Sequence, residues 1–216
     1  MPRYPKLPER AICGTALTGY AWFSRPGGSA MAPELQEIFE QIWQSFETGA
    51  SETDSAWHTP VIGTFGTTGP ELRMVVLRQV NMESRTLVFH TDKRSHKANE
   101  LNESGQAAWL FFDPASGIQI RATSHARKHH NNDLTRQLWK KVPRYARQIY
   151  AHPQAPGTAL ESFPAGLLSD DEAFSNFLVV HCEVTFLDWL QIRPEGHLRA
   201  RFSWDGQAWN SEWVAP

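Results

Sequence analysis

Two strand-like stretches and one helix start follow one another between Arg73 and Lys97. This segment reads RMVVLRQVNMESRTLVFHTDKRSHK. Its β-branched and aromatic residues favour strands, while Asn81, Glu83 and Ser84 favour a turn between them. Ser95 then stands where a helix would begin, and a serine in that position is a common helix cap. The segment therefore predicts an antiparallel hairpin that leads into a helix.

The rest of the chain repeats this strand pattern at short spacing. Strands are predicted at His58–Gly66, Leu72–Val80, Thr86–Thr91, Gln106–Asp113, Gly117–Arg127, Phe177–Leu190, Leu198–Trp204 and Ala208–Val214. Helices are predicted at Pro33–Thr48, Ser95–Glu103, Asn132–Lys141 and Arg144–Tyr150. Hairpin turns between the strands favour antiparallel pairing over parallel crossovers. We expect a mainly β fold, a closed or nearly closed antiparallel barrel with peripheral helices.

Length and composition are those of one domain with an appendage. The 216 residues are 41% apolar, which is enough to bury one core. Residues 1–32 carry several prolines and glycines and show no clear periodicity. We therefore expect an N-terminal arm over residues 1–32 and one folded domain over residues 33–216.

Charge and cysteine usage limit the classes of partner. Lys and Arg number 21 against 23 Asp and Glu, so no global basic field draws the chain to nucleic acid or to an anionic membrane. No apolar stretch is long enough to span a bilayer. Cys13 and Cys182 lie far apart, which argues against a disulfide scaffold or a zinc site. We expect a cytoplasmic protein without a metal, nucleic-acid or membrane partner.

The end of the Arg73–Lys97 segment has the chemistry of a phosphate site. A strand end that feeds a helix start brings free backbone N–H groups together with the Ser95 hydroxyl and nearby cations. A solvated basic turn with an ordinary serine cap explains the same residues, and on composition alone that interpretation is favoured. Local chemistry thus supports a phosphate site without naming the ligand.

Four pieces of sequence, in order, resemble the pyridoxamine 5′-phosphate oxidase family. They are Arg73–Arg78, Phe89–Lys97, Gln119–Arg121 and Arg199–Phe202. The resemblance implies an FMN-binding split β-barrel of Greek-key-like topology, and a homodimer that holds the flavin at the subunit interface.

The resemblance also implies a set of cofactor residues. Arg73 and Lys97 would hold the FMN phosphate, Gln119 would address the isoalloxazine edge, and Arg201 would lie near the ring. His96 stands where the family often has a second cation, so that contact would be weaker or pH-dependent. The full implied set is Arg73, Val75, Leu77, Arg78, His90, Thr91, Ser95, His96, Lys97, Gln119 and Arg201.

The substrate side departs from the family. Where the family has a Tyr, an Arg and a Ser that hold the substrate phosphate, this chain has Leu138, Val142 and Ala146. We therefore expect FMN to be retained and oxidation of vitamin B6 phosphates to be weak or absent. The cations left for an anionic or aromatic substrate are Arg78, His197 and Arg199.

Three classes of function remain open from the sequence. The first is an FMN-dependent oxidoreductase acting on a small molecule, for which no protein acid or base needs to be assigned because the flavin takes the hydride. The second is a non-catalytic carrier of FMN or haem, with His90, His96 or His125 as the iron ligand of the haem version. The third is a purely structural dimer.

Overall fold

Residues 31–103, 105–162 and 166–216 are described by a computed structural model. The expected N-terminal arm lies outside these residues except for its last two positions. No helix in the described part of the chain has the length and apolarity needed to cross a membrane.

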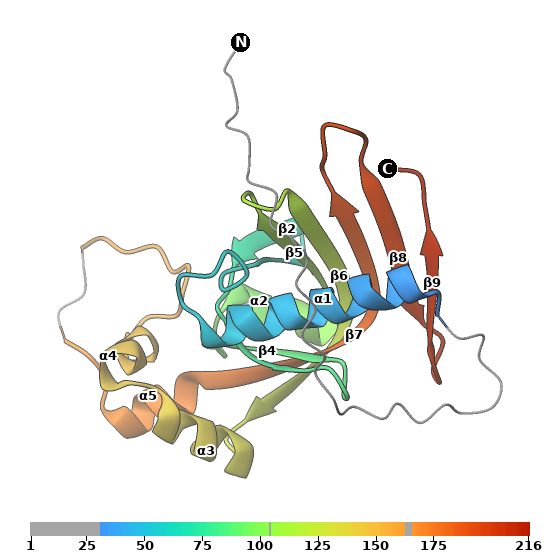
Figure 1. Cartoon of the computed structure of the whole chain (residues 1–216). Coiled ribbons are helices and arrows are strands. Elements are labelled where there is room, and N and C mark those ends of the chain that lie inside the picture. The colour runs from blue at the N-terminus through green and yellow to red at the C-terminus, as the bar shows by residue number, and fades with distance from the viewer. Residues whose placement is uncertain (1–30, 104, 163–165) are drawn as a thin grey trace. The chain divides into compact units, whose positions relative to one another are not determined.

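One antiparallel sheet of nine strands forms the centre of the described fold (Figure 1). The strands are β1 (Val61–Gly66), β2 (Gly69–Met74), β3 (Leu77–Asn81), β4 (Thr86–Asp92), β5 (Gln106–Asp113), β6 (Ile118–His130), β7 (Phe177–Gln191), β8 (Leu198–Trp204) and β9 (Trp209–Trp213). They pair in the order β2-β1-β5-β6-β7-β4-β3, and β8 pairs with β7 and with β9. On one edge of β7, β4 pairs with residues 177–183 and β8 with residues 186–191. The expected mainly β fold with peripheral helices is confirmed.

Strands β2 and β3 stand at the two ends of this pairing order. They are consecutive in the chain, but they are not paired with each other. The predicted single strand Leu72–Val80 is divided, because β2 pairs with β1 while β3 pairs with β4. Val75 and Val76 join the two strands. The Val75 N–H donates to the Pro60 carbonyl oxygen at 3.0 Å, and the Leu77 N–H donates to His58 at 2.9 Å. The barrel is therefore interrupted at this junction.

Helix α1 (Pro33–Ser51) covers the core face of the sheet, as Figure 1 shows. Pro33 begins it, where a missing backbone N–H has no cost. Its apolar stripe ends in Phe46, which packs on Phe111 with ring centroids 4.5 Å apart, and Phe39 packs on Phe202 at 5.4 Å. The apolar residues that show helical spacing in the sequence are thus the ones that α1 buries in the main core.

A second, smaller core lies under the helices drawn at the lower left of Figure 1. These are α3 (Asp133–Lys141), α4 (Arg144–Arg147), the 3-10 turn η1 (Gln148–Tyr150) and α5 (Asp170–Asn176). The buried residues of this core are Val88, Leu138, Trp139, Tyr150, Ala151, Ala173, Phe177 and Val179. Helix α5 was not predicted, although Ser169 and Glu172 form a capping box at its start. The remaining helix, α2 (His96–Glu103), follows β4 as expected.

Candidate functional site

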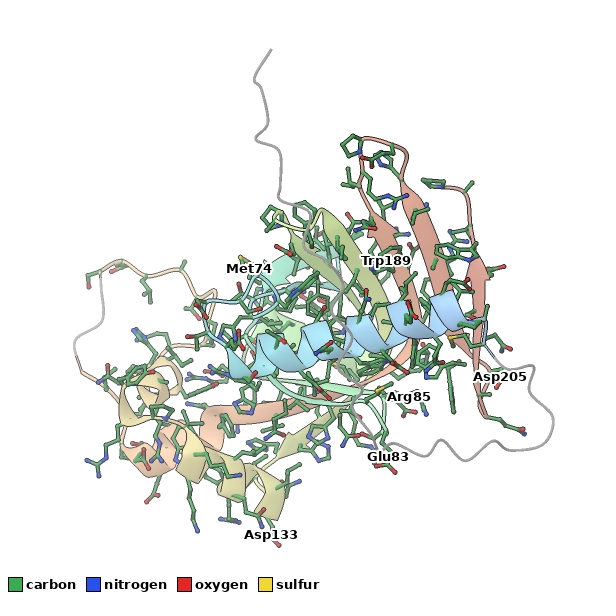
Figure 2. The ribbon with its side chains drawn as sticks, in the orientation of Figure 1. Met74, Glu83, Arg85, Asp133, Trp189 and Asp205 are labelled. Atoms are coloured by element: carbon green, nitrogen blue, oxygen red, sulfur yellow. The ribbon has the colours of Figure 1, made fainter. Side chains whose placement is uncertain are left out.

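A cavity of about 330 Å³ opens beside the junction of β2 and β3. This volume lies within the range of small-molecule sites. The cavity is lined by Thr59, Met74, Val75, Val76, Arg78, His90, Thr91, Lys97, Ile149 and Tyr150. Met74, labelled in Figure 2, marks the end of β2 at its rim. Four separate parts of the chain therefore meet around one hollow.

Five of the residues implied by the sequence line this cavity, namely Val75, Arg78, His90, Thr91 and Lys97. Five others were missed: Thr59, Met74, Val76, Ile149 and Tyr150. Met74 and Val76 lie inside the Arg73–Arg78 motif, so their position in the sequence could have indicated them. Tyr150 comes from η1, far along the sequence, and no local pattern connects it to the motif.

Thr91, Ser95 and Lys97 form a polar corner at the end of β4. The Lys97 ammonium donates to Thr91 Oγ1 at 3.3 Å, and Ser95 Oγ lies 3.3 Å from the same oxygen. Burial, then the nearby Arg73 charge, lowers the pKa of Lys97 below its ordinary value. A half-buried cation that is disfavoured in this way gains from a bound anion.

The Ser95 hydroxyl does not act as the forward-facing cap that the sequence suggested. It donates back to the Asp92 carbonyl oxygen at 2.7 Å, and the Ser95 N–H bonds the same oxygen at 3.1 Å. Ser95 is buried. This turn fixes the hydroxyl beside Thr91, so the residue belongs to the polar corner rather than to the helix end alone.

Arg73 lies next to the polar corner and is held by α2. Its Nη2 donates to Glu100 Oε2 at 2.7 Å, its Nη1 bonds the Thr64 hydroxyl, and the same nitrogen donates to the Glu71 carbonyl oxygen at 2.9 Å. Burial acts to raise the pKa of Glu100, but the hydrogen bonds from Thr64 and Arg73 hold it below its ordinary value. Arg73, Lys97 and Glu100 together leave one positive charge at this corner.

Arg94, in the middle of the basic run, has a structural role. Its guanidinium pairs with Asp92 at 2.7 Å and donates to the His152 and Pro153 carbonyl oxygens at 3.0 and 3.1 Å. These contacts fix the segment after η1. His96 is exposed at the start of α2, with Gly157 close to its ring. Neither side chain lines the cavity.

Arg78 enters the cavity from an irregularity in β3. Leu77 pairs with Phe89 and Gln79 with Val88, so Arg78 is the extra residue of a bulge. Because the strand is broken between Arg73 and Arg78, period-two alternation does not determine the faces on which these two side chains lie. Among the described residues, no carboxylate pairs with Arg78. Its guanidinium is therefore available to a ligand in the cavity.

His90 is neutral at neutral pH. Burial, then the charges of Arg78 and His181, lowers the pKa of His90 to about 4. Its ring packs edge-on against Phe177 at 4.9 Å, and its Nε2 is buried without a hydrogen-bond partner among the described residues. His90 can therefore offer a lone pair or an N–H to a ligand, but no charge.

Val75 and Leu77 contribute little polar capacity. The Leu77 side chain is fully buried in the main core, and the N–H groups of both residues are already bonded to the segment before β1. A direct side-chain contact from Leu77 to a ligand is excluded by this burial. Leu77 supports the wall of the cavity from within the core.

The other implied residues lie on a different surface, the outer face of the sheet. Gln119 is on β6, and Arg199 and Arg201 are on β8, where both arginines bond the buried Asp188 of β7. His197 is exposed in the β7–β8 turn, and its Nδ1 accepts from the Arg193 N–H at 3.2 Å. The structure thus divides the expected site into the cavity and the outer face.

The positions that replace the substrate phosphate clamp offer no polar side chain. Leu138 is buried in the second core, and Val142 and Ala146 are half-buried. The nearby Arg147 is bound to Asp170 at 3.0 Å and to the Trp139 carbonyl oxygen at 2.9 Å. A converging set of donors for a phosphate monoester is missing from these positions.

A comparison with known proteins matches one segment of the chain that contains both the Arg73–Lys97 segment and most of the cavity residues. Residues 39–129 match the model of the pyridoxamine 5′-phosphate oxidase FMN-binding domain. The resemblance to this family is confirmed. The matched segment contains all of β1 to β5 and eight of the ten cavity residues, since only Ile149 and Tyr150 lie beyond it. FMN is the cofactor that this family domain binds.

Solved structures share the fold of this chain. A pyridoxamine 5′-phosphate oxidase-related, FMN binding protein from Nostoc punctiforme PCC 73102 is 22% identical, with a TM-score of 0.67 over 87% of this chain and 100% of that one. PhzG from Burkholderia lata 383, in complex with tetrahydrophenazine-1-carboxylic acid, is 18% identical, with a TM-score of 0.64 over 87% of this chain and 98% of that one. Both establish the split-barrel arrangement around the matched domain.

The residues present fit the phosphate end of FMN. The polar corner supplies two hydroxyls and a cation disfavoured by burial, and Arg73 adds a second cation beside it. Net positive charge, hydroxyls and the start of α2 are the features that favour a phosphate group. The adjoining cavity wall is largely apolar, as a planar ring requires.

Proposed function

We propose that this chain is an FMN-dependent oxidoreductase in which Arg73, Thr91, Ser95 and Lys97 hold the cofactor phosphate. The observation that carries the proposal is the placement of the polar corner and Arg73 at one end of the cavity, inside the segment that matches the FMN-binding domain. When bound, FMN supplies the hydride chemistry of the reaction.

The residues of this chain then have binding and positioning roles. Val75, Val76 and Tyr150 line the apolar part of the cavity and exclude water from it. Arg78 extends into the cavity with no carboxylate partner among the described residues, which suits an anionic or electron-rich substrate. His90, whose pKa of about 4 keeps it neutral, can share a hydrogen bond with cofactor or substrate.

We further propose a homodimer that covers the outer face of the sheet. Large apolar side chains stand exposed on that face: Phe65, Leu72, Met74, Leu110 and Phe112. An exposed apolar set of this kind on neighbouring strands is typical of an interface. A second copy seated there would bring Gln119 and Arg201 of one copy toward the flavin of the other, which explains why they lie apart from the cavity within one chain.

A carrier without turnover is the second candidate. His90 favours its haem version, because a neutral imidazole with a buried, unpartnered Nε2 has the lone pair that a haem iron takes. Haem and flavin have different absorption spectra, so a spectrum separates the haem carrier from a flavoprotein.

The test is the absorbance spectrum of the purified protein, followed by mass identification of whatever dissociates on denaturation. We expect flavin bands and FMN. A protein that is colourless and takes up no FMN when it is supplied contradicts the proposal, and a Soret band favours the haem carrier.

Turnover is tested on the FMN-loaded protein. Bleaching of the flavin by reduced nicotinamide, and its return with an acceptor, supports an oxidoreductase. If no physiological electron donor reduces the bound flavin, the protein is a flavin carrier instead of an oxidoreductase. Pyridoxamine 5′-phosphate is expected to be a poor substrate, since Leu138, Val142 and Ala146 supply no phosphate donors.

A further inference from the structure

Three arginines surround one buried carboxylate on the outer face. Asp188 of β7 is 1% exposed and lies between β6 and β8. Arg121 Nη2 donates to its Oδ2 at 2.6 Å, and Arg199 donates through Nε to Oδ1 at 2.9 Å and through Nη2 to Oδ2 at 2.8 Å. Arg201 Nε reaches Oδ2 at 3.3 Å. We refer to Arg121, Arg199 and Arg201 as the arginine cluster.

The arginine cluster carries more positive charge than Asp188 compensates. Burial acts to raise the pKa of Asp188, but the hydrogen bonds from Arg199 and Arg121 hold it below its ordinary value, so the carboxylate is charged at neutral pH. Three guanidinium groups then face one carboxylate. Glu212, the register partner of Arg201 on β9, forms no ion pair with the cluster among the described residues. Two positive charges remain in excess.

The donors of the arginine cluster are fixed in place and still accessible. Arg121 and Arg201 each give one N–H to Asp188, out of the five that a guanidinium carries. The exposed fractions of the Arg121, Arg199 and Arg201 side chains are 50%, 22% and 40%. Flexible surface arginines lose conformational entropy when they bind, but these three are already oriented by a buried anchor.

One row of paired residues runs across the sheet from the rim of the cavity to the cluster. Pairing places in one row Met74, Val61, Leu110, Arg121, Asp188 and Arg201. Met74 lines the cavity at one end of this row, and the cluster occupies the other end. The apolar middle of the row separates the two.

We propose that the arginine cluster is an oxyanion site that receives the carboxylate or phosphate group of the substrate, with Asp188 as its positioning residue. The proposal rests on the proposed flavoenzyme function and names the chemical class of its substrate. An anion that enters the cluster gains charge-assisted hydrogen bonds from donors already aimed toward it.

The first test compares matched ligands on the FMN-supplemented protein by calorimetry. Benzoate and phenyl phosphate carry an oxyanion, and benzamide presents the same ring without charge. We expect the better anion to bind about ten-fold more tightly than benzamide or better, as hydrogen bonds to charged groups imply. Which anion is preferred distinguishes a carboxylate substrate from a phosphate one. Equal affinity for all three ligands overturns the proposal.

Arg121→Gln isolates the cluster, because Arg121 has no part in the proposed cofactor site. We expect this variant to lose the preference for the anion, while Arg127→Gln, an exposed arginine on the same strand, keeps it. An equal loss in both variants indicates a general charge effect and contradicts the site. FMN titrations on the same samples report the cofactor site separately, so the two proposals fail independently.

Asp188→Asn tests the positioning role. The substitution removes a negative charge, so simple attraction would strengthen anion binding, whereas loss of the anchor weakens it. We expect weaker binding by several-fold, with partial recovery in Asp188→Glu. Tighter binding in Asp188→Asn contradicts the positioning role. If that variant does not fold, the Arg121 and Arg127 pair decides the site.

Discussion

Arg73 and Glu100 form an ion pair at 2.7 Å between β2 and α2, beside the corner that is proposed to hold a phosphate. The carboxylate orients the guanidinium, and it also cancels part of the positive charge that would attract the phosphate. Glu100→Gln keeps a hydrogen-bonding oxygen and removes the charge. We expect FMN to bind several-fold more tightly to this variant, as measured by quenching of flavin fluorescence.

The control for that substitution is Glu71→Gln, which removes an exposed carboxylate on β2, the strand that carries Arg73. We expect it to leave FMN affinity close to that of the unaltered protein. Weaker binding in Glu100→Gln would mean that Glu100 acts mainly by holding Arg73 in place.

Lys97 is the cation with most to gain from a bound phosphate. Lys97→Gln should weaken FMN binding by about ten-fold or more, since a charge-assisted hydrogen bond contributes about 1.5–3 kcal/mol. Lys93→Gln, four residues earlier and exposed, is the matched control and should have little effect. Equal losses in the two variants would assign the effect to overall charge instead of to the polar corner.

His90 should make the fold sensitive to acid. Its pKa is lowered to about 4 in the folded state, against an ordinary value of 6.5, so the unfolded chain takes up the proton first as the pH falls. The free energy of unfolding is therefore unaffected by His90 above about pH 6.5. It falls between about pH 6.5 and about pH 4, by up to about 3 kcal/mol. Urea unfolding at several pH values should show a smaller loss for His90→Gln than for the unaltered protein.

Gly49 should resist the substitution that usually stabilises a helix. Alanine is favoured over glycine inside helices by about 1 kcal/mol. A Cβ at residue 49 would lie 2.5 Å from the Trp57 carbonyl oxygen, so the helix or the following segment must move. We expect Gly49→Ala to lower the melting temperature, while Glu47→Ala on the exposed side of α1 does not. A rise in melting temperature for Gly49→Ala would contradict this packing.

The proposed dimer can be tested without the flavin. Leu72 is 71% exposed on the outer face, and Leu72→Glu should shift the protein toward the monomer in sedimentation. Leu160→Glu introduces the same charge on an exposed leucine outside the sheet and should leave the mass unchanged. If the unaltered protein sediments as a monomer, the proposed interface is contradicted.

Local patterns predicted most of the fold, because period-two strands and the helical stripe of α1 carry their own signal. The break at Val75 and Val76 had none, since RMVVLR reads as one continuous strand and only the exchange of pairing partners divides it. Helix α5 did have a signal, the Ser169 and Glu172 capping box, which the turn-rich surroundings obscured.

The site was predictable where it is local and not where distant segments meet. Thr91 and Lys97 lie six residues apart and were found together. Glu100 contacts Arg73 across 27 residues, and Asp188 meets Arg121 across 67. A single aspartate in a strand resembles any surface residue until the sheet places arginines on both sides of it. Such residues become visible only when the pairing register is known.

Strand β7 also determines the order in which this chain can fold. Hairpins β3–β4 and β5–β6 are local and can form early, but β4 and β6 both await residues 177–191 for their second partner. Such long-range pairing slows folding, and a nascent chain that ends before β7 exposes two unpaired strand edges. Ribosome-bound intermediates of this protein should therefore be prone to aggregation until residues 177–191 have been synthesised.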